Sequence, residues 1–225
     1  MSFEEGATIG VGSVAAAAAL YDKLAIPWPQ NPPSRPYDDA KAPFLGEKPW
    51  ILIWGASCVT GMMAIQLARR SGLRVFAVAG IQNASELRRL GADRVEDRHD
   101  PEAAITAAKV LGIMFAIDCV GSETATNVVK AMSRGGRLAC LVKKPDHVLA
   151  QKAGVLFTDI LIKQFHEKDE FGRRLVDFMS RGLVDREIQP LRYDIVEGGL
   201  NALEHGLQRL KHQAVSGRKL VVKFE

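Results

Sequence analysis

The sequence predicts an α/β protein built on a Rossmann-type doubly wound parallel sheet with helices on both faces, followed by a C-terminal helix and strand. From residue 49 onward, short apolar runs alternate with amphipathic segments, which is typical of βαβ units. A loop of small residues at 55–61 follows the first apolar run, where dinucleotide-binding folds turn from strand to helix. The composition, 47% hydrophobic and 25% charged, is that of an ordinary globular chain.

Three segments follow one another along the 225 residues. The first segment, 1–48, is expected to contain a helix over 3–24, with Ser2 as its N-cap. An extended connector follows the helix and carries six prolines over 27–43. Residues 49–184 form the Rossmann domain, and residues 185–225 form the C-terminal segment. We expect strands at 50–54, 74–79, 114–119, 137–142, 160–165 and 219–224, and helices at 61–70, 84–90, 101–111, 123–133, 169–181 and 196–211.

Charge, cysteines and hydropathy exclude several classes of protein. The net charge is +4 and no basic block is dense enough for a nucleic-acid arm, so no nucleic-acid partner is expected. The three cysteines form no CxxC pair, which indicates a reducing, cytoplasmic setting without a metal site. No apolar run is long enough to span a bilayer.

The sequence GASCVTG at 55–61 carries the strongest chemical signal. A helix that begins here presents free N–H groups and a partial positive charge to a pyrophosphate, and Ser57 and Thr60 add hydroxyl donors. The loop departs from GxGxxG, because Gly55 and Gly61 are six residues apart and the middle glycine is absent. The alternative is that these two glycines only permit a tight turn.

The second strand ends without an acidic residue. NAD-specific folds place Asp or Glu there to hold the ribose 2′-hydroxyl, and here 79–83 reads AGIQN. The sequence therefore favours NADPH over NADH, with Asn83 and Arg98 near the adenosine phosphate. The alternative for Asn83 is a cap on the following helix.

The run AIDCVGS at 116–122 ends another buried strand. We expect the backbone of Cys119, Val120 and Gly121 to face the nicotinamide, and Asp118 to be structural rather than catalytic. Cys119 and Cys140 fit small core residues with no activating partner. The histidines His99, His147, His205 and His212 fit solvated surface positions, and no residue is assigned to catalysis.

In their order, these motifs resemble the medium-chain dehydrogenase/reductase superfamily, and within it the fungal trans-acting enoyl reductases of polyketide biosynthesis. The matching elements are SFEEGAT at 2–8, the proline-rich connector, GASCVTG at 55–61, GAD at 91–93, AIDCVG at 116–121, GG at 135–136 and SGRKLVV at 216–222. The resemblance places the following residues along NADPH, from the phosphates to the nicotinamide: Gly55, Ser57, Cys58, Val59, Thr60, Gly61, Asn83, Arg98, Cys119, Val120, Gly121 and Leu141. Members often have tyrosine at the position of Arg98.

The resemblance implies hydride transfer from NADPH to an α,β-unsaturated thioester on a carrier, with a polyketide synthase as partner. Members carry a GroES-like domain before the helix with which this sequence begins, so the segment 185–225 is expected to lack its usual sheet. We therefore expect this segment to mediate homo-oligomerisation or to repack on the Rossmann core. The alternative function is a non-redox polyketide-tailoring enzyme, such as a cyclase, isomerase, dehydratase or pericyclase, that no longer uses the cofactor.

Overall fold

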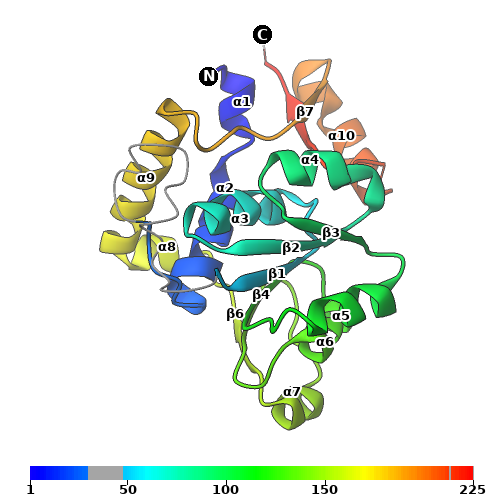
Figure 1. Cartoon of the computed structure of the whole chain (residues 1–225). Coiled ribbons are helices and arrows are strands. Elements are labelled where there is room, and N and C mark those ends of the chain that lie inside the picture. The colour runs from blue at the N-terminus through cyan, green and yellow to red at the C-terminus, as the bar shows by residue number, and fades with distance from the viewer. Residues whose placement is uncertain (30–47, 213, 225) are drawn as a thin grey trace.

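A six-stranded parallel sheet forms the centre of the computed structural model, which describes residues 1–29, 48–212 and 214–224 (Figure 1). The strands lie in the order β3-β2-β1-β4-β5-β6, and every neighbouring pair is parallel. This is the strand order of doubly wound dinucleotide folds. The predicted fold class is confirmed, and the direction of winding reverses between β1 and β4.

The two strands with the strongest apolar runs have the bounds that were predicted. The six strands are β1 (Trp50–Trp54), β2 (Arg74–Ala79), β3 (Arg94–Asp97), β4 (Phe115–Asp118), β5 (Arg137–Cys140) and β6 (Leu156–Asp159). The sequence analysis missed β3, because this edge strand reads RVED and has a weak apolar signal. The strand predicted at 160–165 is wrong, because the apolar run there follows β6 and leads into helix α8 (Gln164–Glu167).

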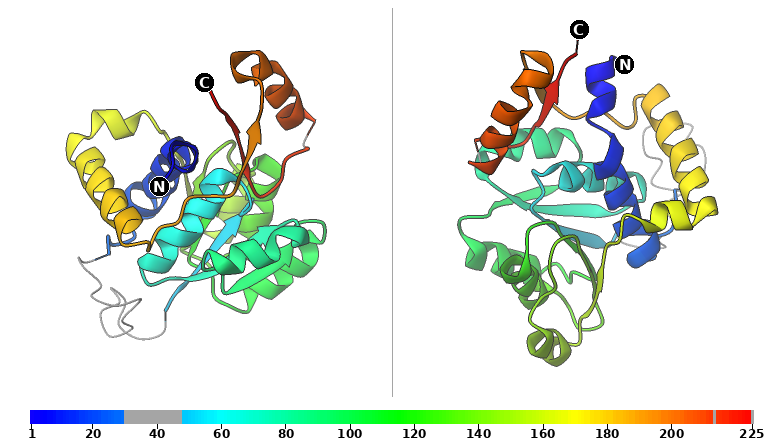
Figure 2. Two further views of the ribbon diagram at one scale, coloured as in Figure 1. Left: turned by 90° about the horizontal axis from the view of Figure 1, so that it is seen from above. Right: turned by 180° about the vertical axis from the view of Figure 1, so that it is seen from behind.

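Helices cover both faces of the sheet, as predicted (Figures 1 and 2). Those beyond residue 49 that flank the sheet are α3 (Val59–Arg70), α4 (Ala84–Arg89), α5 (Pro101–Lys109), α6 (Ser122–Ala131), α7 (His147–Ala153) and α9 (Asp169–Val184). One hydrophobic cluster joins α3, α4 and α9 to one face, and a second joins α5, α6 and α7 to the other. The sequence analysis did not predict α7.

The N-terminal helix is divided, although the sequence predicts one helix over 3–24. It consists of α1 (Phe3–Ala7), α2 (Gly10–Ala17) and the π-helix η1 (Ala18–Lys23). The predicted N-cap is confirmed, since the Ser2 hydroxyl accepts the Glu5 N–H at 3.1 Å. The break falls at Thr8, whose hydroxyl accepts the Leu191 N–H at 3.0 Å and thereby joins the start of the chain to its C-terminal segment.

Most of the proline-rich connector predicted over 27–43 lies outside the described residues, which omit 30–47. The part of the connector that the structure describes, residues 27–29, is packed against the core, because the Trp28 ring stacks on Tyr21 with ring centroids 3.9 Å apart. The Phe178 ring of α9 meets both rings edge-on. The described residues before position 30 therefore pack on the α9 side of the sheet.

The C-terminal segment forms a small sheet of its own. It contains β7 (Tyr193–Val196), the 3₁₀ helix η4 (Gly199–Ala202), α10 (Leu203–Lys211) and β8 (Lys219–Val222), and β7 pairs with β8 in parallel. The helix predicted over 196–211 is wrong in its first half, because residue 196 ends β7 and Gly198 and Gly199 take positive φ values of 110° and 57°. The predicted strand at 219–224 is found at 219–222, with a partner inside the chain.

Candidate functional site

The loop after β1 is fixed to the end of β2 by backbone hydrogen bonds. The N–H groups of Gly55 and Ala56 both donate to the Val78 carbonyl oxygen at 3.0 Å, and the Cys58 N–H donates to the Gly55 oxygen at 3.0 Å. Gly55 has a φ of 78°, in the left-handed region that favours glycine. The loop is therefore a fixed turn at the carboxyl edge of the sheet.

Helix α3 begins at the end of this loop. Cys58 is its N-cap, and the Cys58 Sγ accepts the Gly61 N–H at 3.3 Å. Gly61 packs directly on the loop, because a Cβ there would lie 2.7 Å from both the Ala56 Cα and the Gly55 oxygen. The close packing directs the N-terminal N–H groups of a 12-residue helix toward the end of β1. Ser57 and Val59 are half-buried, whereas Thr60 is 8% exposed.

The loop after β4 lies against the loop after β1. The Cys119 N–H donates to the Trp54 oxygen at 3.0 Å, and a Cβ on Gly55 would lie 2.6 Å from Val120 Cγ2. The half-buried Leu141 joins from the end of β5, since its N–H donates to the Asp118 oxygen at 2.8 Å. The structure thus brings together the predicted site residues of β1, β4 and β5 at the point where the sheet reverses its winding.

Asp118 is completely buried at the end of β4. Its Oδ1 accepts the N–H groups of Val120 and Gly121 at 3.1 and 2.9 Å, so the predicted structural role is confirmed. Its Oδ2 has no hydrogen-bond partner among the described residues. Burial raises the pKa of the Asp118 carboxyl above its ordinary value, because the charged form loses its hydration.

Cys119 is the small core residue that was predicted, since it is 8% exposed and belongs to the hydrophobic cluster that joins α3 to the sheet. A hydrogen bond with Cys119 lowers the pKa of Cys58 to about 7, against burial, which raises it. The same hydrogen bond and burial raise the pKa of Cys119. Cys140 is the small core residue that was predicted, since it is 2% exposed. Its burial raises the pKa of the Cys140 thiol to about 12.

Asn83 and Arg98 lie at the ends of neighbouring strands. The Asn83 side chain does not cap α4, so that alternative is wrong; its Nδ2 donates to the Ser216 Oγ at 2.8 Å instead. The Arg98 N–H donates to the Ala79 oxygen at 2.9 Å, and its side chain is exposed. Sequence reasoning did not assign Ser216 to the site, although the run 216–222 was among the motifs that carried the resemblance.

Residues 80–85, which follow β2 at the carboxyl edge of the sheet, include no acidic residue. Glu86, the first acidic residue after β2, is 5% exposed and ion-paired with Arg89 at 2.6 Å and Arg192 at 2.9 Å. The hydrogen bond from Arg89 lowers the pKa of Glu86, while burial opposes it. Glu86 is therefore committed to arginines within the protein.

The described residues contain neither a cluster of metal-ligating side chains nor a membrane-spanning helix. Within 1–29, 48–212 and 214–224, no three His, Cys, Asp or Glu side chains are grouped so that they could hold a metal ion. No helix in those ranges is long and apolar enough to cross a membrane. The four histidines predicted at the surface, His99, His147, His205 and His212, are all exposed.

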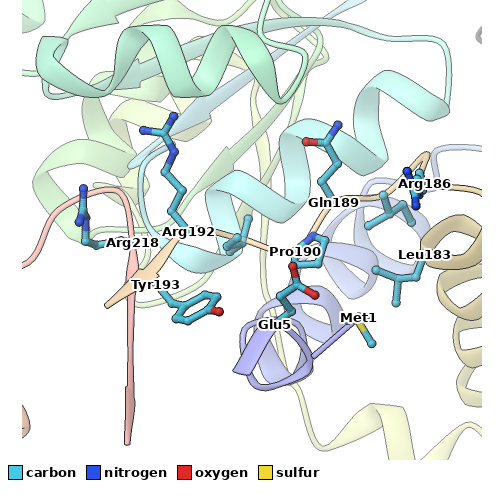
Figure 3. Close-up of a pocket in the computed structure, with 11 residues that line it drawn as sticks. Met1, Glu5, Leu183, Arg186, Gln189, Pro190, Arg192, Tyr193 and Arg218 are labelled. Atoms are coloured by element: carbon cyan, nitrogen blue, oxygen red, sulfur yellow. The ribbon is translucent and has the colours of Figure 1, made fainter. Parts of the chain in front are cut away.

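A pocket of about 760 Å³ lies between α1 and the segment that leads into β7 (Figure 3). Arginine side chains line it together with Glu5 and apolar groups; they are Arg186, Arg192 and Arg218. None of the site residues predicted from the sequence lines this pocket. The carboxyl edge of the sheet, with its loops 55–61 and 118–121, and this pocket are therefore separate features.

The fold and the two packed loops define a Rossmann-type dinucleotide domain. The zinc-binding dehydrogenase family model matches residues 59–175, just over half of the chain. The chain belongs to this family, which is part of the medium-chain dehydrogenase/reductase superfamily.

Whole-chain comparisons point to one group within the superfamily. The chain is 32% identical to the trans-enoyl reductase ACTTS2 of Alternaria alternata over 100% of its own length and 66% of that relative. It is 31% identical to the trans-enoyl reductase caaB of Aspergillus niger over 98% of its length and 65% of that relative. The chain thus spans about two thirds of these proteins.

A solved structure supports the fold. A mutant of Etr1p, a 2-enoyl thioester reductase of Candida tropicalis, was solved in complex with NADP and crotonyl-CoA. It matches 94% of this chain with a TM-score of 0.75 and 13% identity, and the match covers 60% of that chain. At this identity the likeness concerns the fold alone.

Proposed function

We propose that this chain binds NADPH between the ends of β1 and β4 and serves as the nucleotide-binding part of an enoyl reductase that works with a polyketide synthase. One observation carries the binding proposal: the loops 55–61 and 118–121 pack on each other where the sheet reverses its winding. Dinucleotides bind at this point of open α/β sheets. Similarity to trans-enoyl reductases along the whole chain supports the reaction class and the partner.

The donor set of this edge suits a pyrophosphate. The N-terminal N–H groups of α3 and the half-buried Ser57 hydroxyl would hold the phosphate oxygens, since helix N-termini attract anions. Gly55 and Gly61 keep the backbone of the loop close to the ligand, and Val59 and Thr60 form its first helical turn. Cys58 lies at the end of the loop, and its Sγ already accepts the Gly61 N–H, so this N–H is not free to bind a phosphate oxygen.

At the adenosine end, Asn83, Arg98 and Ser216 would contact the 2′-phosphate. The carboxylate of Glu86 is held by two arginines, so it does not repel a phosphate there. At the other end, Cys119, Val120, Gly121 and Leu141 would line the nicotinamide. Bound NADPH would supply a hydride to the β-carbon of an enoyl thioester, and these residues would orient its ring.

The first experiment is calorimetric titration of the 225-residue chain with NADPH and NADH. A micromolar NADPH affinity, on the order of −8 kcal/mol, with weaker NADH binding supports the proposal. Absence of binding to either nucleotide contradicts it and favours the non-redox polyketide-tailoring alternative. Crotonyl thioester reduction, followed through NADPH absorbance with and without the synthase, then tests the reaction.

A charge placed in the loop tests the location. Ser57→Glu puts a carboxylate beside the N-terminus of α3, so NADPH binding should weaken at least tenfold, or about 1.4 kcal/mol. Thr106→Glu is the matched control, because it adds the same charge at an exposed position of α5. Equal affinities of the two variants contradict the assignment of the loop.

A further inference from the structure

The pocket between α1 and the segment that leads into β7 has fixed walls. The Thr8 hydroxyl accepts the Leu191 N–H at 3.0 Å, which joins the end of α1 to this segment. The Gln189 N–H donates to Gln66 Oε1 of α3 at 2.8 Å, and Ile188 is 1% exposed in the core cluster. The pocket is therefore preformed, and its volume of about 760 Å³ is within the range of small-molecule sites.

Positive charge predominates among the side chains that line this pocket. Three arginines line it together with one carboxylate, that of Glu5. Figure 3 shows Arg192 and Arg218 toward one end of the pocket and Arg186 toward the other. The Glu5 Oε2 accepts the Ser2 N–H at 2.8 Å in the capping box of α1, so this carboxylate is already engaged. An anion in the pocket would meet an excess of positive charge.

Ion pairs within the protein do not cancel this excess. Arg192 shares the Glu86 carboxylate with an arginine of α4, and Arg218 shares the Asp194 carboxylate with an arginine of α10. Two arginines on one carboxylate leave a net positive charge at each of these places. Arg186 has no ion pair with any residue that the structure describes. The Arg186 guanidinium is therefore the group best able to hold an anion.

Arg186 takes a backbone conformation that favours glycine. It follows α9 and has a φ of 58°, in the left-handed region where helices usually end on glycine. The Gly182 oxygen accepts the N–H groups of Glu187 and Ile188, each at 2.8 Å, and closes the end of the helix around it. An arginine side chain adds nothing to such a turn, and residues in strained conformations concentrate at functional sites. The guanidinium at this position therefore points to a ligand.

We propose that the pocket binds an amphipathic anion, an acyl chain that ends in a carboxylate or a phosphate, with its charged head on Arg186. The chain would lie against Leu183 and Pro190, which are half-buried and line the pocket. Arg192 and Arg218 raise the positive potential along the pocket, so they favour an anion over a cation of the same length. The proposal goes beyond NADPH binding and does not rest on it.

The first test is equilibrium dialysis of the 225-residue chain with radiolabelled decanoate. We expect saturable binding that decyl phosphate displaces, and the tighter of these two anions identifies the head group. Decyltrimethylammonium has a chain of the same length and a positive head, so it should displace decanoate at least about tenfold less well. Equal displacement by this cation, or no saturable binding of either anion, overturns the proposal.

Arg186→Gly tests the location without disturbing the turn. It removes the guanidinium and leaves a residue suited to a φ of 58°, so decanoate affinity should fall at least about tenfold while the melting temperature holds or rises. Arg173→Ala is the matched control, because it removes the same charge from an exposed position of α9 outside the pocket. The control should leave decanoate affinity unchanged, and equal affinities of the two variants overturn the assignment of the head group.

Saturating NADPH separates this pocket from the proposed nucleotide site. Decanoate should bind equally well with and without NADPH, because no residue of the loops 55–61 and 118–121 lines the pocket. Competitive displacement of decanoate by NADPH would place it at those loops and overturn the proposal. A chain that binds decanoate but no NADPH contradicts the proposed function alone, and the results with Arg186→Gly still decide this proposal.

Discussion

The central sheet and the C-terminal segment 185–224 are held in place by different kinds of contact. Both faces of the sheet are buried under helices, and Ile51, Leu52 and Ile53 of β1 are fully inaccessible. The C-terminal sheet has two strands, and its helix α10 leaves Leu207 65% exposed. Two-stranded sheets contribute little stability by themselves.

Polar contacts to the rest of the molecule hold the C-terminal segment. Lys219 Nζ donates to the Ala7 oxygen at 2.7 Å, and the Gln189 N–H donates to Gln66 Oε1 at 2.8 Å. Arg192 reaches Glu86, and Ser216 accepts from Asn83. Ile188 and Leu191, at the start of the segment, belong to the hydrophobic cluster of the sheet. Beyond them polar contacts attach the segment, so the two regions should respond differently to substitution.

The largest effect should come from the core of the sheet. Phe76 of β2 is fully buried, so Phe76→Ala removes packed volume and should lower the free energy of unfolding by about 3–5 kcal/mol. Urea unfolding followed by circular dichroism measures this loss. A loss below about 1 kcal/mol would mean that the core is less tightly packed than the structure shows.

The loop at the carboxyl edge should tolerate no added methyl group. Gly61→Ala places a Cβ 2.7 Å from Ala56 Cα, so we expect a loss of about 1–3 kcal/mol in stability together with weaker NADPH binding. Gly10→Ala is the control, because a Cβ there meets nothing within 4 Å, and it should stabilise α2 by up to about 1 kcal/mol. Equal behaviour of the two variants in thermal unfolding and calorimetry would refute the packing argument.

Removing a polar contact to the C-terminal segment should have a smaller and pH-dependent effect. Glu86→Gln weakens the pairing with Arg89 and Arg192, and because both arginines are partly exposed the loss is about 1 kcal/mol at neutral pH. The hydrogen bond from Arg89 lowers the folded-state pKa of Glu86 below its ordinary 4.5. The stability it contributes is therefore full above that value and falls as the pH drops through the folded-state pKa.

Thermal unfolding of the unmodified chain and Glu86→Gln across a pH series checks this sign. The difference between the two proteins should shrink on acidification below pH 4.5. Limited proteolysis should cut the segment 185–224 faster in the variant at neutral pH. A difference that grows on acidification would contradict the assignment.

The smallest effect should come from the exposed face of α10. Leu207→Ala removes a side chain that is 65% exposed, so the free energy of unfolding should change by less than about 0.5 kcal/mol. Light scattering of the same variant and the unmodified chain tests the oligomerisation expected through this segment. A larger loss of stability in the variant, falling with dilution, would show that a second copy covers this face.

The sequence was sufficient where local signals were strong. The bounds of β1 and β2, the turn at 55–61 and the N-cap Ser2 were all predictable, because each depends on residues close together in the chain. Where the local signal was weak or ambiguous, prediction failed. The edge strand β3 reads RVED, and the apolar run at 160–162 follows a strand rather than forming one.

The amino-acid sequence by itself determined the fold class and the loop that marks its nucleotide edge, since apolar periodicity and small residues act locally. Only the tertiary structure decided that the loop after β4 packs on Gly55 and that Asn83 binds Ser216, which lies 133 positions further along the chain. Such contacts depend on which strands become neighbours. Burial of both faces of the sheet sets the strand order β3-β2-β1-β4-β5-β6, and that order, rather than any local pattern, brings these side chains together.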